Sequence, residues 1–238
     1  MRKIKNLNIA VILGSGLDKV ASGFSRKKVL PLDKIGVHNK KISIAEFKGF
    51  KVLFFIGRKH YYEGSSYEGI VSIIRFAKKL GVKNIIITNA AGSLNENFNE
   101  SELMLIESHV NFNQKFIHKK NYNHYDLNLK NIFVRICNDL NILCHQGTYC
   151  CLPGPAYETK SEVKVLRKFG FDAVGMSTVP EVMESNYLGI NVLAVSVITN
   201  ILKENTAYIT DHKKILLTAN KTSKTLLKVI QELIIQLN

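Results

Sequence analysis

The sequence contains no apolar run long enough to cross a membrane. Nowhere in its 238 residues do about 18 apolar residues follow one another, the length that a transmembrane helix needs. The apolar run at 9–13 is too short for the core of a signal peptide and leads into Gly14 without a cleavage site of small residues. We therefore interpret this run as the first strand of the mature protein and expect no membrane partner.

Cysteine is scarce, and its spacing fits neither a zinc site nor a disulfide framework. The four cysteines form no C-x-x-C pair, and Cys150 and Cys151 are adjacent. This pattern is typical of a reducing compartment, so we expect a cytoplasmic location. We also expect no metal, because His60 and Glu63 are only two ligands without a third.

Acidic residues are few, with 19 Asp and Glu against 33 Lys and Arg, which gives a net charge of +14. Such an excess fits a nucleic-acid partner or an anionic substrate. The lysines are scattered, however, and no arginine cluster or basic helix with interleaved aromatics occurs. The chain is also rich in Lys, Asn and Ile, whose codons are A/T-rich. A solvated lysine surface is therefore favoured over nucleic-acid binding.

No internal repeat or Pro/Gly/Ser-rich linker interrupts the chain, so we expect a single domain over residues 1–238. Apolar runs predict strands at 8–13, 41–47, 51–56, 84–88, 103–106 and 191–198. Helical spacing predicts helices at 67–80, 126–140, 159–169, 179–188 and 210–237. This alternation indicates an α/β fold with a mixed central β-sheet flanked by helices. In such folds ligands bind beyond the carboxyl ends of the strands.

A glycine-rich turn, Gly14-Ser15-Gly16, follows the first predicted strand. Its backbone N–H groups and hydroxyl suit an anion, although the same residues also suit a plain tight turn. Lys19 stands where a dinucleotide fingerprint needs its third glycine, and no G-x-x-x-x-G-K-[ST] loop occurs. The sequence therefore lacks both common nucleotide-binding signatures.

Residues 57–64 (GRKHYYEG) hold the densest group of functional side chains. Arg58 offers a planar fork that matches phosphate, and His60 can donate to an anion while Glu63 orients it and keeps it cationic. Tyr62 adds an aromatic ring of the kind that covers a sugar. The alternative is a solvated charged loop, but this mixture between two glycines favours a site.

Further polar groups follow other predicted elements. The small residues 89–92 permit a ligand to approach the backbone. Tyr157 can stack on a planar ring, and Glu158 can accept from ring N–H groups. Ser177 precedes a helix N-terminus, and Asn200 offers a donor and an acceptor. Each has a simpler explanation as a turn or a cap, but together they indicate one site.

Together these segments resemble the purine nucleoside phosphorylase family, in the trimeric low-molecular-weight branch that also contains methylthioadenosine phosphorylases. The matching blocks keep the family's order: GSG at 14–16, GRKHYYEG at 57–64, NAAGS at 89–93, LPGPAYET at 152–159, DAVGMSTVPEV at 172–182 and SVITN at 196–200. The resemblance implies that phosphate attacks the anomeric carbon of a purine nucleoside, releasing free base and (deoxy)ribose 1-phosphate. It implies no metal and no cofactor, with phosphate as co-substrate, and a homotrimer with shared active sites.

The resemblance also assigns roles to matching positions. The phosphate binders correspond to Ser15, Arg58, His60, Ser177 and the backbone amide of Ala90. The ribose-contacting positions correspond to Tyr62, Met176 and His212. The base-binding positions correspond to Tyr157, Glu158 and Asn200. Catalysis is expected to depend on His60, Glu63 and Asn200.

Asn200 bears on the choice of base. In the family an Asn at this place goes with 6-oxopurines and an Asp with 6-aminopurines, because a neutral amide donates to N7 while its oxygen serves the ring edge. Asn200 and His212 therefore favour inosine and guanosine, with their deoxy forms. The alternatives are a methylthioadenosine phosphorylase of the same fold, or a catalytically inactive nucleoside- or nucleic-acid-binding protein.

One segment departs from the family pattern. Residues 111–128 are short and rich in Lys and Asn, where the family carries an aromatic residue that closes a neighbouring subunit's site. Phe116, Tyr122 and Tyr125 are the candidates for that residue.

Overall fold

A computed structural model describes residues 4, 6–30, 41–113, 124–203 and 211–238. Within these ranges nine strands form one sheet in the order β2-β3-β4-β1-β5-β8-β7-β6-β9. The strands are β1 (Ile9–Leu13), β2 (Ser25–Val29), β3 (Lys41–Phe47), β4 (Phe50–Ile56), β5 (Asn84–Ser93), β6 (Leu103–Asn111), β7 (Cys144–Cys151), β8 (Ala173–Gly175) and β9 (Asn191–Ile201). Parallel and antiparallel pairs both occur, so the expected mixed sheet is confirmed.

Strand pairing brings several carboxyl ends to one edge of the sheet. β1 is parallel to β4 and β5, and β5 is parallel to β9. β5 also pairs with β8, and the pairing continues through β7 and β6 back to β9. Five strands thus close into a ring beside the open sheet of β1 to β4. The carboxyl ends of β1, β4, β5 and β9 meet where the ring and the open sheet join.

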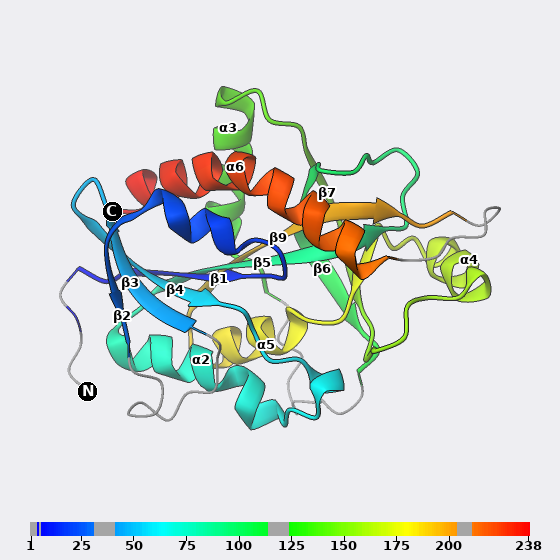
Figure 1. The fold of residues 1–238 in the computed structure, drawn as a ribbon, viewed down its shortest axis with the longest axis horizontal. Helices are drawn as coiled ribbons and strands as arrows, with labels where there is room; N and C mark the ends of the chain where they lie inside the picture. The colour runs from blue at the N-terminus through cyan, green and yellow to red at the C-terminus, as the bar shows by residue number, and fades with distance from the viewer. Residues whose placement is uncertain (1–3, 5, 31–40, 114–123, 204–210) are drawn as a thin grey trace.

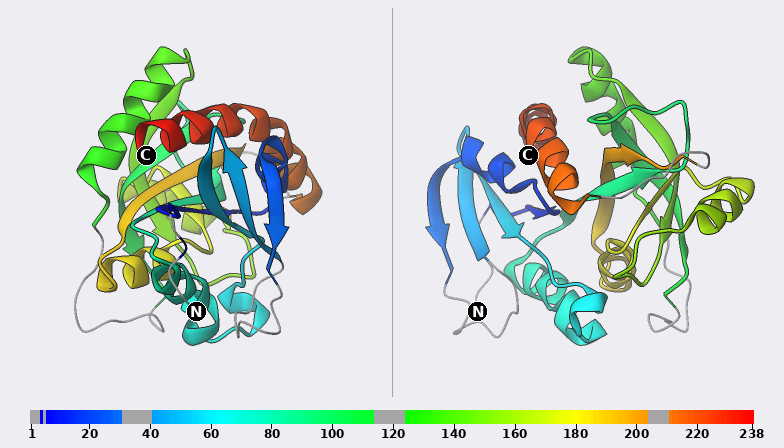
Figure 2. Two further views of the ribbon diagram at one scale, coloured as in Figure 1. Left: turned by 90° about the vertical axis from the view of Figure 1, so that its left-hand side faces the viewer. Right: turned by 45° about the vertical axis from the view of Figure 1, so that its right-hand side comes forward.

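Helices cover both faces of the sheet (Figure 1). The helical elements are η1 (Asp18–Gly23), η2 (Tyr61–Glu63), α2 (Tyr67–Leu80), α3 (Leu127–Asp139), α4 (Lys160–Lys168), α5 (Val179–Tyr187) and α6 (His212–Gln236). The helices α2 and α5 lie against one face, and α6 with η1 lies against the other (Figures 1 and 2).

The core explains why the central strands are continuously apolar. In β1, Ala10 and Ile12 belong to the cluster that contains residues of α2 and α5. Ile9, Val11 and Leu13 belong to the opposite cluster, with residues of η1 and α6. All five side chains are fully buried. Because both faces of the strand are covered, residues pointing to either face are apolar. Burial of each large side chain contributes roughly 1.5–3 kcal/mol to the stability of the fold.

Local signals set the helix ends where the sequence predicts them. Helix α2 begins after Ser66, whose hydroxyl accepts from the Gly69 amide at 3.2 Å, and it ends at Gly81, whose φ is +96°. Helix α4 begins at the predicted capping box of Thr159 and Glu162. These bounds confirm the capping interpretation.

Three strands run further than their predicted ranges. The residues 89–93 continue β5, residues 107–111 continue β6, and residues 199–201 continue β9. In β5 the extension is built from small and polar residues that lack β propensity, but it pairs with β9, with a register shift between Ala91 and Gly92. Pairing with a neighbour therefore overrides local propensity here. The simpler alternative for residues 89–92, a turn, is wrong, because these residues belong to β5.

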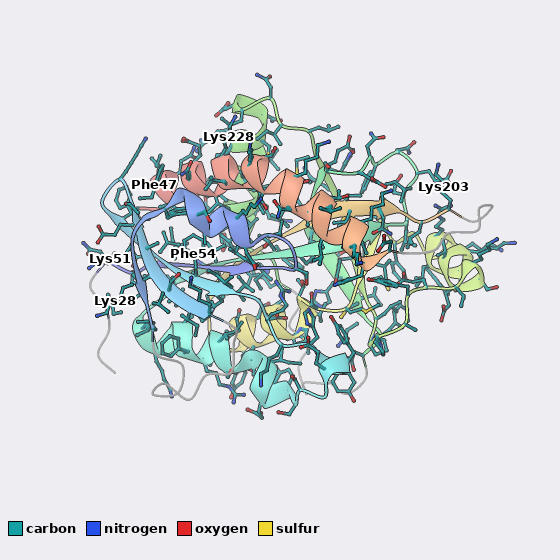
Figure 3. The ribbon with its side chains drawn as sticks, viewed as in Figure 1. Lys28, Phe47, Lys51, Phe54, Lys203 and Lys228 are labelled. Atoms are coloured by element: carbon teal, nitrogen blue, oxygen red, sulfur yellow. The ribbon has the colours of Figure 1, made fainter. Side chains whose placement is uncertain are left out.

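The positive charge is spread over the surface. Lys28, Lys203 and Lys228 are exposed and point outward from separate parts of the molecule (Figure 3). Phe54, by contrast, is buried, with its ring 4.8 Å from that of Phe24 beside η1. None of the described helices is both long and apolar enough to span a bilayer.

Candidate active site

A pocket that is partly open to solvent lies at the carboxyl-terminal edge of the sheet. It gathers almost every site residue that the sequence predicts. Those lining it are Ser15, Arg58, His60, Tyr62, Ala90, Tyr157, Glu158, Met176, Ser177, Asn200 and His212. The remaining predicted residue, Glu63, lies behind His60 rather than on the pocket wall.

The turn after β1 packs tightly against β5. The Gly14 amide donates to the Thr88 hydroxyl at 3.2 Å, and that hydroxyl donates to the Ile12 carbonyl at 2.9 Å. A Cβ on Gly14 would lie 2.8 Å from the Asn89 Cα atom, which no side chain permits. Glycine is therefore required for close backbone approach, and this approach places Ser15 at the pocket.

Arg58 is held in one orientation inside the protein. Its side chain is buried, and Nη1 donates to Ser177 Oγ at 2.9 Å and to Thr178 Oγ1 at 3.2 Å. Nη2 donates to the Thr88 carbonyl, and Glu181 Oε1 lies 3.5 Å from Nη1. Among the described residues its Nε atom has no hydrogen-bond partner. A fixed guanidinium beside a serine hydroxyl suits an oxyanion. We call this part of the pocket, formed by Arg58 and Ser177, the oxyanion corner.

His60 adds an imidazole ring to the pocket beside Arg58. Its ring stacks on that of Tyr62, with centroids 4.8 Å apart. Glu63 Oε2 accepts from the His60 amide at 2.9 Å and lies 3.5 Å from the ring Nδ1 atom. Glu63 therefore contacts His60 and does not line the pocket itself.

Tyr62 and Met176 also line the pocket. The turn at Gly154 closes over both, since a Cβ there would lie 2.5 Å from Met176 Sδ and 3.0 Å from Tyr62 Cδ1. Gly154 also has a φ of +67°, which favours glycine. Burial raises the pKa of Tyr62, so its hydroxyl stays neutral.

A carboxyl group, from Glu158, and an amide, from Asn200, also line the pocket. Burial raises the pKa of Glu158 above its usual range. Asn200 is 4% exposed, and its Oδ1 atom accepts from the Thr199 hydroxyl at 3.0 Å, which leaves Nδ2 to donate. Tyr157 and His212 are in contact where the pocket is lined by both, and the Tyr157 hydroxyl lies 3.2 Å from His212 Nδ1. Together these groups suit a planar heterocycle with mixed donors and acceptors.

The chain matches the family model described as the phosphorylase superfamily over residues 8–235. The chain belongs to this superfamily. It is 34% identical to purine nucleoside phosphorylase 1 of Bacillus subtilis, covering 96% of this chain and 92% of that protein. It is 31% identical to purine nucleoside phosphorylase 1 of Geobacillus stearothermophilus, covering 95% and 90%. The family resemblance of the sequence is confirmed.

Solved structures of this phosphorylase superfamily share the fold. The purine nucleoside phosphorylase of Schistosoma mansoni in complex with adenosine aligns with a TM-score of 0.89 at 30% identity, covering 98% of this chain and 92% of that one. The complex of that enzyme with inosine aligns with a TM-score of 0.86 at 29% identity, covering 96% and 89%.

Sequence reasoning missed three buried side chains that contact Arg58 or its partners. They are Asn89, Thr178 and Glu181. All three lie within motifs that the sequence singles out, but nothing in those motifs shows that Arg58 folds onto them. Contacts between residues about 30 to 120 positions apart in the chain are set by the sheet order, which local patterns do not reveal.

Tyr125 is not free to close a neighbour's site. It is 4% exposed and belongs to the core of its own chain, with its hydroxyl 2.7 Å from His109 Nδ1. The other candidates, Phe116 and Tyr122, lie outside the described residues. Across the described ranges no three His, Cys, Asp or Glu side chains gather as a metal site would require.

Proposed function

We propose that the protein is a purine nucleoside phosphorylase that cleaves inosine and guanosine, and their deoxy forms, with inorganic phosphate. One observation carries this proposal: a single pocket has an oxyanion corner at Arg58 and Ser177 and a carboxyl–amide pair at Glu158 and Asn200. The relatives support it, since they are named purine nucleoside phosphorylases. The Schistosoma enzyme has been solved with inosine, with guanosine, and, as isoform 2, with ribose-1-phosphate.

The phosphate is bound by donors at one end of the pocket. Arg58, Ser177 and His60 donate to its oxygens, together with Ser15 and the Ala90 amide. An oxygen of this phosphate attacks the anomeric carbon, and the bond from that carbon to the purine breaks with its electron pair leaving on the base. The transition state resembles an oxocarbenium ion, so the adjacent phosphate charge stabilises it. The reaction needs no cofactor besides phosphate.

The purine leaves with negative charge that the other end stabilises. Asn200 Nδ2 donates to N7, and Glu158 accepts from ring N–H groups. Tyr62 and Met176 cover the ribose, while His212 faces its 5′-hydroxyl and Tyr157 lies beside the base. Glu63 keeps His60 oriented toward the phosphate. In this account catalysis depends on His60, Glu63 and Asn200, and binding depends on the rest.

We further propose a cytoplasmic homotrimer whose subunits complete each other's sites, as the family resemblance implies. The partners are then the nucleoside, phosphate and two further copies of the chain. Light scattering coupled to size-exclusion chromatography tests this: a mass of three chains supports it, and a monomer that retains full activity contradicts it.

A substrate panel tests the function. Inosine, guanosine, adenosine and methylthioadenosine are each incubated with and without phosphate, and free base is quantified. Base release from inosine and guanosine only with phosphate supports the proposal. Release mainly from methylthioadenosine would favour the alternative phosphorylase. No release by folded protein, with salt-dependent binding to DNA or RNA, would favour an inactive binding protein.

A further inference from the structure

The backbone at Thr178 is strained, and it lies directly behind the oxyanion corner. Thr178 has φ +77° and ψ −51°, and the Val179 amide donates to the Ser177 carbonyl at 2.9 Å. This is a γ-turn with positive φ, a rare and strained conformation, and it is costlier still for a β-branched residue. Such strain persists only where surrounding contacts hold the residue in place.

The hydroxyl of Thr178 makes the contacts that hold it. Its oxygen accepts from Asn89 Nδ2 at 2.8 Å and from Arg58 Nη1 at 3.2 Å, and the residue is fully buried. A hydroxyl has two lone pairs and one hydrogen. Both lone pairs are therefore used, and the Thr178 hydroxyl has only its hydrogen left to share.

Ser177 receives that hydrogen. The Ser177 and Thr178 hydroxyl oxygens lie 3.4 Å apart, and Ser177 Oγ also accepts from Arg58 Nη1 at 2.9 Å. With its own two lone pairs thus occupied, Ser177 keeps one free hydrogen. Since Ser177 lines the pocket, that hydrogen is available to an acceptor there.

We propose that Thr178 is a positioning residue for the anion site. Its hydroxyl, fixed by Asn89 and Arg58, makes Ser177 a donor toward the pocket, and the strained turn keeps the two hydroxyls side by side. The corner then presents N–H and O–H donors to phosphate oxygens. This inference rests on the proposed function, which supplies phosphate as the anion.

The test compares Thr178→Val, which keeps the shape and removes the hydroxyl, with Thr178→Ser, which keeps the hydroxyl. Thr178→Val loses the hydrogen bond between the Thr178 and Ser177 hydroxyls. This loss is expected to raise the KM for phosphate about tenfold, the effect of one well-placed hydrogen bond to an anion. The KM for inosine stays within about twofold, and Thr178→Ser restores the KM for phosphate to within about threefold of wild type.

A matched control removes another buried threonine hydroxyl. Thr222 is 2% exposed and donates to the Thr218 carbonyl within α6, away from the pocket. Thr222→Val is expected to leave the KM for phosphate unchanged. Equal rises in the KM for phosphate and for inosine in Thr178→Val would indicate a general packing defect and would overturn the positioning role.

Calorimetric titration with inorganic phosphate alone tests the positioning role of Thr178 independently of the proposed phosphorylase function. Weaker phosphate binding by Thr178→Val, in a protein that cleaves no nucleoside, would support the positioning role while the proposed function fails. Wild-type affinity in Thr178→Val, or no phosphate binding by the wild type, overturns the inference.

A second variant covers the case in which Thr178→Val does not fold. Asn89→Leu removes one donor to Thr178, which frees a lone pair to which Ser177 can turn its hydrogen. The expected result is a severalfold rise in the KM for phosphate, and an unchanged value overturns the inference.

Discussion

Arg58 Nη1 lies 3.5 Å from Glu181 Oε1, and each side chain is 1% exposed. Neither oxygen of the Glu181 carboxylate accepts a hydrogen bond from the described residues. Glu181 lies in the first turn of α5, where the helix dipole also favours a negative charge. The pair joins the segment after β4 to the start of α5, and it places a buried negative charge next to the Arg58 cation.

Replacing Glu181 by Gln is expected to destabilise the protein by about 3 kcal/mol, because it leaves the buried Arg58 cation uncompensated. Urea denaturation measures this loss. The control is Glu100→Gln, which breaks the exposed pair with Lys214 and is expected to cost at most about 1 kcal/mol. Equal losses in the two variants would contradict the role given to the buried pair.

The raised pKa of Glu158 predicts that kcat/KM falls on the acid side of its pH profile, which we call the acid limb. A free glutamic acid has a pKa of about 4.3, and burial raises the pKa of Glu158 above that. Its carboxylate is needed as an acceptor, so kcat/KM for inosine falls as the pH falls through the raised pKa. Glu158→Gln removes this limb and lowers kcat/KM at neutral pH at least about tenfold.

The ratio of wild-type to Glu158→Gln activity is the measurement, since titration of phosphate itself affects both proteins alike. This ratio is expected to decline toward acid pH. A ratio that does not change with pH would show that another group causes the limb.

Burial lowers the pKa of His109 to about 4, whereas an unfolded chain has a His pKa of about 6.5. The folded state therefore favours neutral His109, whose stabilising effect is complete above the unfolded pKa and is lost as the pH falls from about 6.5 toward 4. His109→Gln is expected to flatten this part of the stability curve. Thermal unfolding of both proteins between pH 7.5 and 4.5 measures it, and parallel curves would contradict the assignment.

The fold was predictable wherever burial imposes a continuous or periodic apolar pattern on an element. The apolar run of β1 and the amphipathic spacing of α2 follow directly from burial on two sides and on one side. The strands β7 and β8 escape prediction because the run CHQGTYCC is polar and β8 has only three residues. Both are held by pairing with neighbours distant in sequence.

The site was predictable as a set of residues but not as a set of contacts. Strand ends carry the pocket residues, which is why polar groups after apolar runs pointed to them. Thr178 is the residue before the first turn of α5, yet its side chain caps no helix amide. Its partners Arg58 and Asn89 lie about 90 to 120 positions away in the chain, and only the folded sheet brings them together.

Asn200→Asp tests the base-binding end. A carboxylate cannot donate to N7 of a 6-oxopurine but suits a protonated N7 or an amino group, so preference is expected to move toward adenosine. The ratio of kcat/KM for inosine to that for adenosine should fall about tenfold or more, in line with one hydrogen bond gained or lost. An unchanged ratio would contradict the role given to Asn200.

The central claim is that phosphate, and not water, breaks the glycosidic bond in this pocket. The most direct measurement incubates the protein with inosine and inorganic phosphate and quantifies hypoxanthine, ribose 1-phosphate and free ribose together. The account predicts one ribose 1-phosphate for each hypoxanthine and no base release when phosphate is omitted. Hypoxanthine with an equal amount of free ribose, at a rate that does not depend on phosphate, would contradict it.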